Sequence, residues 1–402
     1  MPSSCLDRNA SAHHLGSPQA GRALRRAGTV ITAALALTLT SVVSSSALAA
    51  PAPATAHPAA PAWDIVKQVH NGPFGGFTTV IAVGRNGGWA FNQGPVPTAW
   101  RRSGSTWTQV RFPGQANEVV VAAGATSPTD VWAFTAGGAQ SQALRWNGRT
   151  WTVQRSFAQQ IGGAAVISSS DIWVFGQPYF PGTGLGAWHY NGRTWSRVAS
   201  GRGLQGGSAL AANNIWAVDG SDIAHWNGSG WSRTSVSHLL PPKTELNGPL
   251  LTGIFAESAH SVYAIGNGGL EDEGGPLVIL HWNGKQWSKV AEGNFGFGTQ
   301  PLQQASSDGH GGLWLPMPGV DGQKSYLLHY APGHPLAEAS LPHGPSGISI
   351  EAVALIPGTT DLLAGGDTHA ADKPGTNVVA VLLQYGSCAA SVPAWQRTGS
   401  GT

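Results

Sequence analysis

The 402-residue sequence predicts an all-β fold, a single seven-bladed β-propeller of four-stranded antiparallel blades preceded by a signal peptide. Three observations lead to this prediction. A hairpin-like stretch recurs along the chain, aromatic residues recur at fixed places around it, and a run of small or apolar residues precedes each copy. Self-similarity with a period of about 40–50 residues is typical of propellers, in which each unit buries its faces against its neighbours.

One stretch of the sequence recurs, with three close copies and one more diverged copy at residues 99–110. Residues 279–290 read ILHWNGKQWSKV, with an Asn-Gly pair between two runs in which apolar and polar residues alternate. A two-residue Asn-Gly link favours a type I′ turn, because both central residues need positive φ. We therefore expect an antiparallel hairpin that joins the third and fourth strands of a unit. Related stretches occupy residues 99–110, 143–154, 187–198 and 223–234.

Aromatic residues mark the same two places in successive units. One tryptophan follows the turn glycine by three residues, at Trp107, Trp151, Trp195, Trp231 and Trp287. A second aromatic marks the second strand, at Trp89, Trp132, Trp173, Trp216, Tyr263 and Trp314. Residues 361–365 continue this series, which makes seven units. Upstream runs of small residues, such as residues 119–125, suit the crowded strand nearest a propeller axis.

Two segments compete to close the ring. Residues 62–69 resemble an outermost strand without a hairpin partner of its own, and they could complete the seventh unit. Residues 394–398 resemble the fourth strand at 230–234 and could do the same. Either arrangement removes an exposed sheet edge, and the sequence leaves both open.

The first 49 residues have the order of an export signal. Arg22, Arg25 and Arg26 precede an apolar run over residues 30–43, and Ala47-Leu48-Ala49 supplies small residues for cleavage. A membrane anchor is the alternative, but the apolar run is short for a bilayer. We predict secretion by the general secretory route with cleavage near Ala49. Residues 50–62, rich in Pro and Ala, are expected to form a linker, and residues 63–398 the propeller.

Charge and cysteine content narrow the classes of partner. The formal net charge of +2 falls to about −1 once residues 1–49, with four arginines and one aspartate, are removed. Neither nucleic acid nor an anionic membrane is then favoured. Cys5 leaves with the leader, and Cys388 has no partner for an intramolecular disulfide. We expect a monomer without a stable membrane anchor, metal or other cofactor.

The repeat pattern over residues 63–398 resembles the secreted bacterial propellers grouped with kelch repeats and the propeller of galactose oxidase. The hairpins also resemble the Asp-box turn of sialidase-type propellers, Ser-x-Asp-x-Gly-x-Thr-Trp. This chain keeps residues 148–151 and 192–195 (Gly-Arg-Thr-Trp) but has Trp146 and Tyr190 where the Asp belongs. The resemblance implies the fold and says little about activity.

Any binding site is expected on one face of the propeller. The links between second and third strands and between units are long and irregular, and in propellers both sets emerge on the same face. Variable loops on a rigid scaffold usually hold the binding site. The candidate ligand-binding residues in these loops are Tyr179, Phe180, Glu271, Asp272, Glu273, Phe295, Phe297, Asp367 and His369. The acidic triplet could equally be a solvated loop, and the aromatics could pack within their own loops.

Four histidines share one repeat position in the third strand, at His189, His225, His281 and His329. A recurring position favours a scaffold role over metal ligation. No histidines or cysteines occur at metal-ligand spacing, and no nucleophile or acid-base motif is present.

These observations favour a secreted, non-catalytic propeller that binds an extracellular protein or polysaccharide through its long-loop face. The alternative is an extracellular carbohydrate-active enzyme, a glycosidase or lyase, in which carboxylates from separate blades converge at the axis. A structural role at the cell envelope is a third possibility. The galactose oxidase resemblance would imply a cysteine cross-linked to a tyrosine at a copper site, but Cys388 lies at the C-terminal end of the pattern. No catalytic residue is therefore assigned.

Overall fold

The computed structural model describes residues 61–176, 184–198, 203–242, 250–267, 276–295, 305–317, 325–342, 347–369 and 378–386. They lie within one compact unit, Ala60–Thr402. The predicted signal peptide and all but the last two residues of the predicted linker lie outside the described residues. No helix in the described segments is long and apolar enough to cross a membrane.

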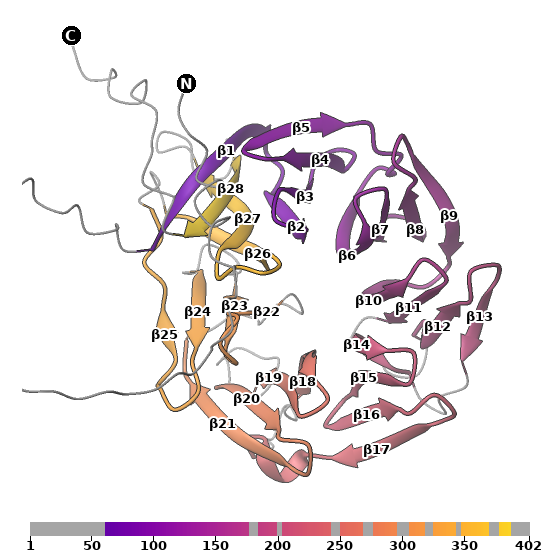
Figure 1. The fold of residues 1–402 in the computed structure, drawn as a ribbon, viewed down its shortest axis with the longest axis vertical. Coiled ribbons are helices and arrows are strands. Elements are labelled where there is room, and N and C mark those ends of the chain that lie inside the picture. Colours follow the sequence, from indigo (N-terminus) through magenta and orange to yellow (C-terminus); the bar gives the residue numbers. More distant parts are fainter. Residues whose placement is uncertain are drawn as a thin grey trace, which may run out of the picture. The chain divides into compact units, whose positions relative to one another are not determined.

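The described strands form antiparallel sheets arranged around a central opening, which is a β-propeller (Figure 1). Alternation of apolar and polar residues lets each strand bury side chains against the sheets on either side. Four of the four-stranded sheets run from the axis outward in chain order. They are β2 (Phe77–Val83), β3 (Gly87–Asn92), β4 (Thr98–Ser103) and β5 (Thr106–Val110); β6 (Glu118–Ser127), β7 (Asp130–Gly137), β8 (Ser141–Trp146) and β9 (Trp151–Phe157); β18 (Leu250–Ser258), β19 (Ser261–Asn267), β20 (Leu277–Trp282) and β21 (Trp287–Gly293); and β22 (Ser306–Ser307), β23 (Leu313–Met317), β24 (Tyr326–Tyr330) and β25 (Ala337–Glu338).

The prediction of seven separate four-stranded blades is wrong. Five separate four-stranded sheets form among the described residues, and the two units that contain the hairpins at 187–198 and 223–234 share one eight-stranded sheet. This sheet contains β10 (Ile161–Ser168), β11 (Asp171–Gly176), β12 (Ala187–Tyr190), β13 (Trp195–Val198), β14 (Gln205–Ala211), β15 (Asn214–Asp219), β16 (Asp222–Trp226) and β17 (Trp231–Ser235), with a short 3-10 helix, η2 (Ser237–Leu239), after it.

A close approach of two strands explains the merger. Gly176 at the end of β11 pairs in parallel with Gln205 of β14, and its amide donates to the Leu204 carbonyl at 3.2 Å. At Gly207 no side chain separates the strands: a Cβ there would lie 2.2 Å from Cε2 of Phe175. Glycine in a strand often marks such a close backbone approach. The repeat is therefore preserved in this region while the boundary between two sheets is lost.

The fifth four-stranded sheet closes the ring. It contains β26 (Ser349–Leu355), β27 (Leu362–His369) and β28 (Val378–Gly386) from the C-terminal end, and β1 (Ala62–Gly72) from the N-terminal end. β1 pairs antiparallel with β28, from Ala62 opposite Gly386 to Gly72 opposite Val378. The N-terminal segment is thus the outermost strand that the sequence left undecided, and residues 394–398 lie outside the described part of the chain.

The Asn-Gly hairpins form, but their turn differs from the predicted one. Trp146 pairs with Trp151, so residues 147–150 make a four-residue turn in which the Asn147 amide donates to the Thr150 carbonyl at 3.2 Å. The Asn147 side-chain oxygen accepts the amides of Arg149 and Thr150, both at 3.0 Å. Gly148 has φ of +95°, whereas Asn117 is the only described non-glycine residue with positive φ. The type I′ prediction is wrong because the asparagine side chain, and not a positive φ, organises the turn.

Aromatic side chains pack neighbouring units against one another. Trp89 on β3 lies 5.0 Å, centroid to centroid, from both Trp146 and Trp151 of the following sheet. The same contact recurs around the ring and includes the closing sheet, where Trp314 meets Trp63 at 5.9 Å. Edge-to-face aromatic pairs add about 1 kcal/mol each to the burial of their area. The equivalent pairs are Trp132 with Trp195, Trp173 with Trp231, Trp216 with Trp287 and Tyr263 with Tyr330.

Candidate functional site

A cavity of about 490 Å³ lies along the propeller axis. It is lined by the inner strands β2, β6, β10, β14, β18, β22 and β26. Most of the lining residues are glycine, alanine or β-branched, with Phe255 as the single aromatic among them. None of the described residues that line the cavity is ionisable. The volume falls within the range of small-molecule pockets, and the wall is mainly apolar, as such pockets usually are.

The hydroxyl groups of the lining are already engaged in the fold. Thr79 Oγ1 donates to the Val120 carbonyl at 2.6 Å. Ser306 Oγ accepts the Leu355 amide at 2.9 Å, and Ser307 Oγ donates to Glu257 Oε1 at 2.7 Å. A serine nucleophile requires a base aimed at its hydroxyl, usually a histidine. These hydroxyls join neighbouring inner strands, and the Ser307 hydroxyl does so through the Glu257 carboxylate.

A ring of β-bulges surrounds the beginning of the inner strands. In six of them the pairing with the second strand slips by one residue, which inserts an extra residue and bends the strand. The inserted residues, which we call the bulge ring, are Thr78, Val121, Gly162, Gly206, Thr252 and Glu351. Val121 and Gly162 line the cavity. Because inner strands begin after the links between units, the bulge ring lies towards the long-loop face.

Glu351 is the ionisable member of the bulge ring. Its side chain is half-buried on β26, and burial, together with the nearby Asp367 carboxylate on β27, raises the pKa of Glu351 to about 7. A buried carboxylate loses hydration, and a like charge disfavours its ionised form further. β26 also contacts β2, β22, β23 and β24, of which only β24 carries ionisable residues, namely Tyr326, His329 and Tyr330. Glu351 is therefore partly protonated near neutral pH.

Of the predicted site residues, the structure describes Phe295, Asp367 and the backbone of His369. Phe295 packs against Tyr326 at 5.4 Å in the core between the β18–β21 and β22–β25 sheets. Asp367 lies in the closing sheet opposite Ser349 and Ala380, and His369 ends β27 opposite Val378. The structure thus does not group Phe295 with Asp367. Tyr179, Phe180, Glu271, Asp272, Glu273 and Phe297 lie outside the described residues.

Sequence analysis missed Glu351. Its signal is an acidic residue within an inner-strand run of small and apolar residues, SIEAVAL. The position of the bulge, which separates Glu351 from an ordinary core-facing residue, follows only from the pairing with β27.

The four histidines of the third strands are part of the scaffold geometry. His189 Nε2 lies 2.9 Å from Asp171 Oδ1, and its ring stacks on Trp173 at 4.6 Å. His225, His281 and His329 make the equivalent contacts with Asn214, Ser261 and Asp308 at 3.0, 3.2 and 2.8 Å. Burial lowers the pKa of His225 and of His281, which keeps these rings neutral. Among the described residues, no three histidine, cysteine, aspartate or glutamate side chains could together hold a metal ion.

The groups around Asp308 stabilise its ionised carboxylate. Burial alone would raise the pKa of Asp308, but hydrogen bonds from His329 and from the His310 and Gly312 amides outweigh burial and lower it. Both amides reach Oδ1, at 2.7 and 2.8 Å. The carboxylate therefore serves the turn between β22 and β23.

Comparisons with known proteins bear on the fold alone. No protein-family model and no curated protein sequence matches the chain. The extracellular domain of a one-component system from B. thetaiotaomicron aligns at 11% identity and a TM-score of 0.53, covering 79% of this chain and 39% of that one. U3-55K aligns at 9% identity and a TM-score of 0.52, covering 80% and 99%.

A xyloglucanase of family GH74 from Xanthomonas campestris aligns at 15% identity and a TM-score of 0.52, covering 79% of this chain and 55% of that one. This chain spans less than two thirds of the B. thetaiotaomicron and Xanthomonas chains. The three similar structures are an extracellular domain, U3-55K and a xyloglucanase. They agree in architecture and differ in role. They identify the chain as a β-propeller.

Proposed function

We propose that the protein is a secreted, non-catalytic β-propeller that binds an extracellular protein or polysaccharide through the long-loop mouth of its axial cavity. One observation carries the proposal: the described wall of the cavity has no ionisable side chain, and its hydroxyls are engaged in joining the inner strands. A wall of this kind can exclude water from an apolar group and offers little to a chemical step.

Secretion is part of the proposal and is supported by the sequence. The arginines before residues 30–43 and the small residues at 47–49 have the order of a cleaved signal. The kelch and galactose oxidase likeness remains a prediction about the type of propeller.

The test begins with the purified protein on a glycan array and in pull-downs from extracellular fractions. Binding of each partner to the wild type is then compared with binding to Glu351→Lys, which places a positive charge in the bulge ring, and to the matched control Glu338→Lys on the outer strand β25. We expect Glu351→Lys to change affinity at least tenfold and Glu338→Lys to change it less than twofold. A folded protein with no partner in either assay, or equal effects of the two variants, would refute binding at the mouth.

A second candidate is a carbohydrate-active enzyme, and one pair of residues favours it. Glycosidases use a carboxylic acid with a raised pKa beside a second carboxylate, and Glu351 has such a raised pKa beside Asp367. The test is release of reducing ends from a panel of polysaccharides by the wild type, Glu351→Gln and Asp367→Asn. Activity lost in both variants would favour the enzyme, whereas no release by the wild type would eliminate it.

A further inference from the structure

The outer halves of the first three repeat units are rich in arginine and contain no acidic residue. Residues 98–117 hold three arginines, residues 141–160 hold three and residues 187–198 hold two, with no Asp or Glu in any of these ranges. These ranges contain the third and fourth strands of their units. Charge of one sign is thus concentrated along one part of the propeller rim, although the chain as a whole is nearly neutral.

The rest of the rim is different. The equivalent range 222–235 has one Asp and one Arg, and range 277–293 has two Lys and one Glu. Range 326–340 has one Glu and no Lys or Arg, and β28 has no charged residue. The positive charge is therefore a property of three consecutive units and not of the repeat itself.

Five of the eight arginines are exposed: Arg101, Arg111, Arg149, Arg193 and Arg197. We call these five the arginine arc. None of them forms an ion pair with a described residue. The other three have local roles. Arg145 pairs with Asp130 at 2.6 Å, Arg155 lies over the Trp188 ring at 4.4 Å, and Arg102 is buried and donates to Gln384 at 3.2 Å.

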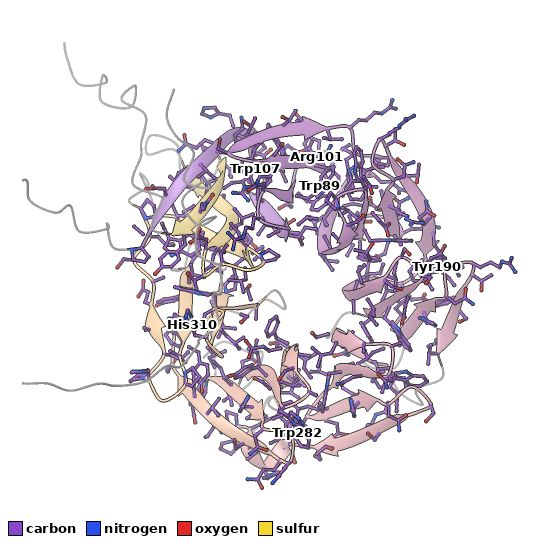
Figure 2. The ribbon with its side chains drawn as sticks, in the orientation of Figure 1. Trp89, Arg101, Trp107, Tyr190, Trp282 and His310 are labelled. Atoms are coloured by element: carbon purple, nitrogen blue, oxygen red, sulfur yellow. The ribbon has the colours of Figure 1, made fainter. Side chains whose placement is uncertain are left out.

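The strands and turns that carry the arginine arc belong to successive sheets of the ring. Figure 1 shows β5, β9 and β13 following one another along the outer edge, and Figure 2 places Arg101 over the first of these sheets. The Arg101 guanidinium lies 5.8 Å from the ring centroid of Trp146, so it reaches from β4 to the next sheet. Arg149 and Arg193 occupy the same position in their Asn-Gly turns. A ligand on this edge would meet one arginine after another.

We propose that the arginine arc binds an acidic polysaccharide that bears carboxylate or sulfate groups. Guanidinium groups bind such oxyanions with two parallel hydrogen bonds, and several in succession fit a polymer whose charges repeat. Exposed hydroxyl and amide side chains lie between the arginines and can bind sugar hydroxyls. They include Thr108, Gln109, Thr152, Gln154, Thr194 and Ser196.

The buried state of the rim tryptophans favours polysaccharide over single-stranded nucleic acid. Proteins that grip single strands stack the bases on exposed aromatic rings. Here Trp107, Trp146 and Trp151 are buried between sheets, with 4–7% of their surface exposed, and Trp188 and Trp195 are half-buried, so none of these rings is fully exposed. The arc therefore offers charge and hydrogen bonds without a stacking platform.

The experiment measures binding of the purified protein to heparin, polygalacturonate, neutral dextran and single-stranded DNA in low and high salt. The wild type is compared with Arg101→Gln/Arg149→Gln/Arg193→Gln/Arg197→Gln. A matched control, Lys67→Gln/Lys285→Gln/Lys289→Gln, removes positive charge elsewhere on the rim. Thermal melts verify that all variants fold, and Arg149→Lys/Arg193→Lys keeps charge while it removes the bidentate geometry.

We expect the wild type to bind heparin or polygalacturonate, and not dextran, with an affinity that falls as salt rises. The quadruple variant should lose at least thirtyfold in affinity, with the slope of log affinity against log salt reduced by about 3. The lysine control should lose less than threefold, and the Arg-to-Lys variant an intermediate amount. No binding of either acidic polysaccharide, an unchanged quadruple variant, or tighter binding of DNA would overturn the proposal. Because Glu351→Lys reports on the cavity mouth, failure of the arc is distinguishable from failure of the proposed function.

Discussion

The rim and the axis of this propeller differ in the space that they leave for side chains. At the rim the sheets diverge, and buried indoles such as Trp107, Trp146 and Trp151 fill the space between them. At the axis the inner strands converge, and glycine or alanine occupies the wall. Gly207, where a Cβ would lie 2.2 Å from Phe175, marks how little space remains. Residue size therefore follows distance from the axis, and charge follows it too, since the arginines are outside and the cavity lining has none.

This difference shows at which positions functional residues can be introduced without disturbing the fold. Rim turns tolerate charge because they are exposed, so the arginine arc varies from unit to unit, whereas the packing positions keep Trp or Tyr in most units. Axial positions are constrained by space, so a single glutamate at the bulge ring is a departure that costs stability. Four substitutions test the contrast, beginning with the largest expected effect.

Removal of a rim indole should cost most. Trp151 is 5% exposed and contacts Trp89 at 5.0 Å, Phe112 at 5.3 Å and Phe91 at 5.7 Å. Trp151→Ala should lower the free energy of unfolding by about 3–5 kcal/mol, because it removes contacts and leaves a cavity. Urea unfolding followed by far-UV circular dichroism measures this. A loss below about 1 kcal/mol would mean that the rim is not held by its aromatics.

Addition of a methyl group at the axis should be the next largest effect. Gly207→Ala forces a shift of Phe175 and should cost about 2 kcal/mol, because overpacking strains a filled site. The matched control is Gly230→Ala at the rim, where a Cβ meets no atom within 4 Å and φ is not positive. The control should be neutral in the same urea titration. Equal costs at the two sites would break the contrast between axis and rim.

The glutamate of the bulge ring should make stability depend on pH. The folded pKa of Glu351, about 7, lies above the ordinary value of 4.5, so the folded state holds a proton that the unfolded state releases. Stability from this group is complete below pH 4.5 and is lost as pH rises towards 7. The shift corresponds to roughly 3 kcal/mol, reduced to about 1–2 kcal/mol by partial solvent contact.

Glu351→Gln isolates this contribution. The variant should match the wild type at pH 4 and exceed its free energy of unfolding by about 1–2 kcal/mol at pH 8. The difference between the two proteins is measured across pH, because other groups titrate in the same window. A difference that is constant with pH would show that Glu351 has an ordinary pKa.

The smallest effect is expected at a rim turn. Asn147→Ala removes the acceptor of two amides at 3.0 Å and should cost about 1 kcal/mol. Thr152→Ala on the exposed face of β9, whose hydroxyl is 3.4 Å from the Arg145 carbonyl, should cost less than about half of that. Thermal melts of the pair separate the two. An Asn147→Ala protein as stable as the control would show that the glycine alone shapes the turn.

The repeat pattern was sufficient to predict the propeller and the positions of its tryptophans, because indole spacing reports sheet-to-sheet packing directly. It could not predict the shared eight-stranded sheet, which depends on how closely Gly207 lets two strands approach. The turn type was predicted wrongly because the Asn147 side chain replaces a backbone conformation. Glu351 was missed because a bulge is a property of pairing between two strands.

The arginine arc was within reach of sequence analysis. The sequence places most of these arginines in or beside the hairpin stretches. It also shows that three successive outer halves contain no acidic residue. What the structure adds is their exposure, their lack of described ion pairs and their succession along one edge. Asp367 and Phe295 were predicted to be ligand-binding residues in loops. Only the sheet topology shows that they belong to different parts of the ring.

The union of β1 with β28 has a consequence for biogenesis. Residues 62–72 do not complete their sheet until residues 378–386 have been synthesised, so the first described strand of the chain waits for the last described one. Truncation at either end would expose the same pair of edges, and a premature stop near residue 377 would leave the N-terminal strand as an open template for self-association.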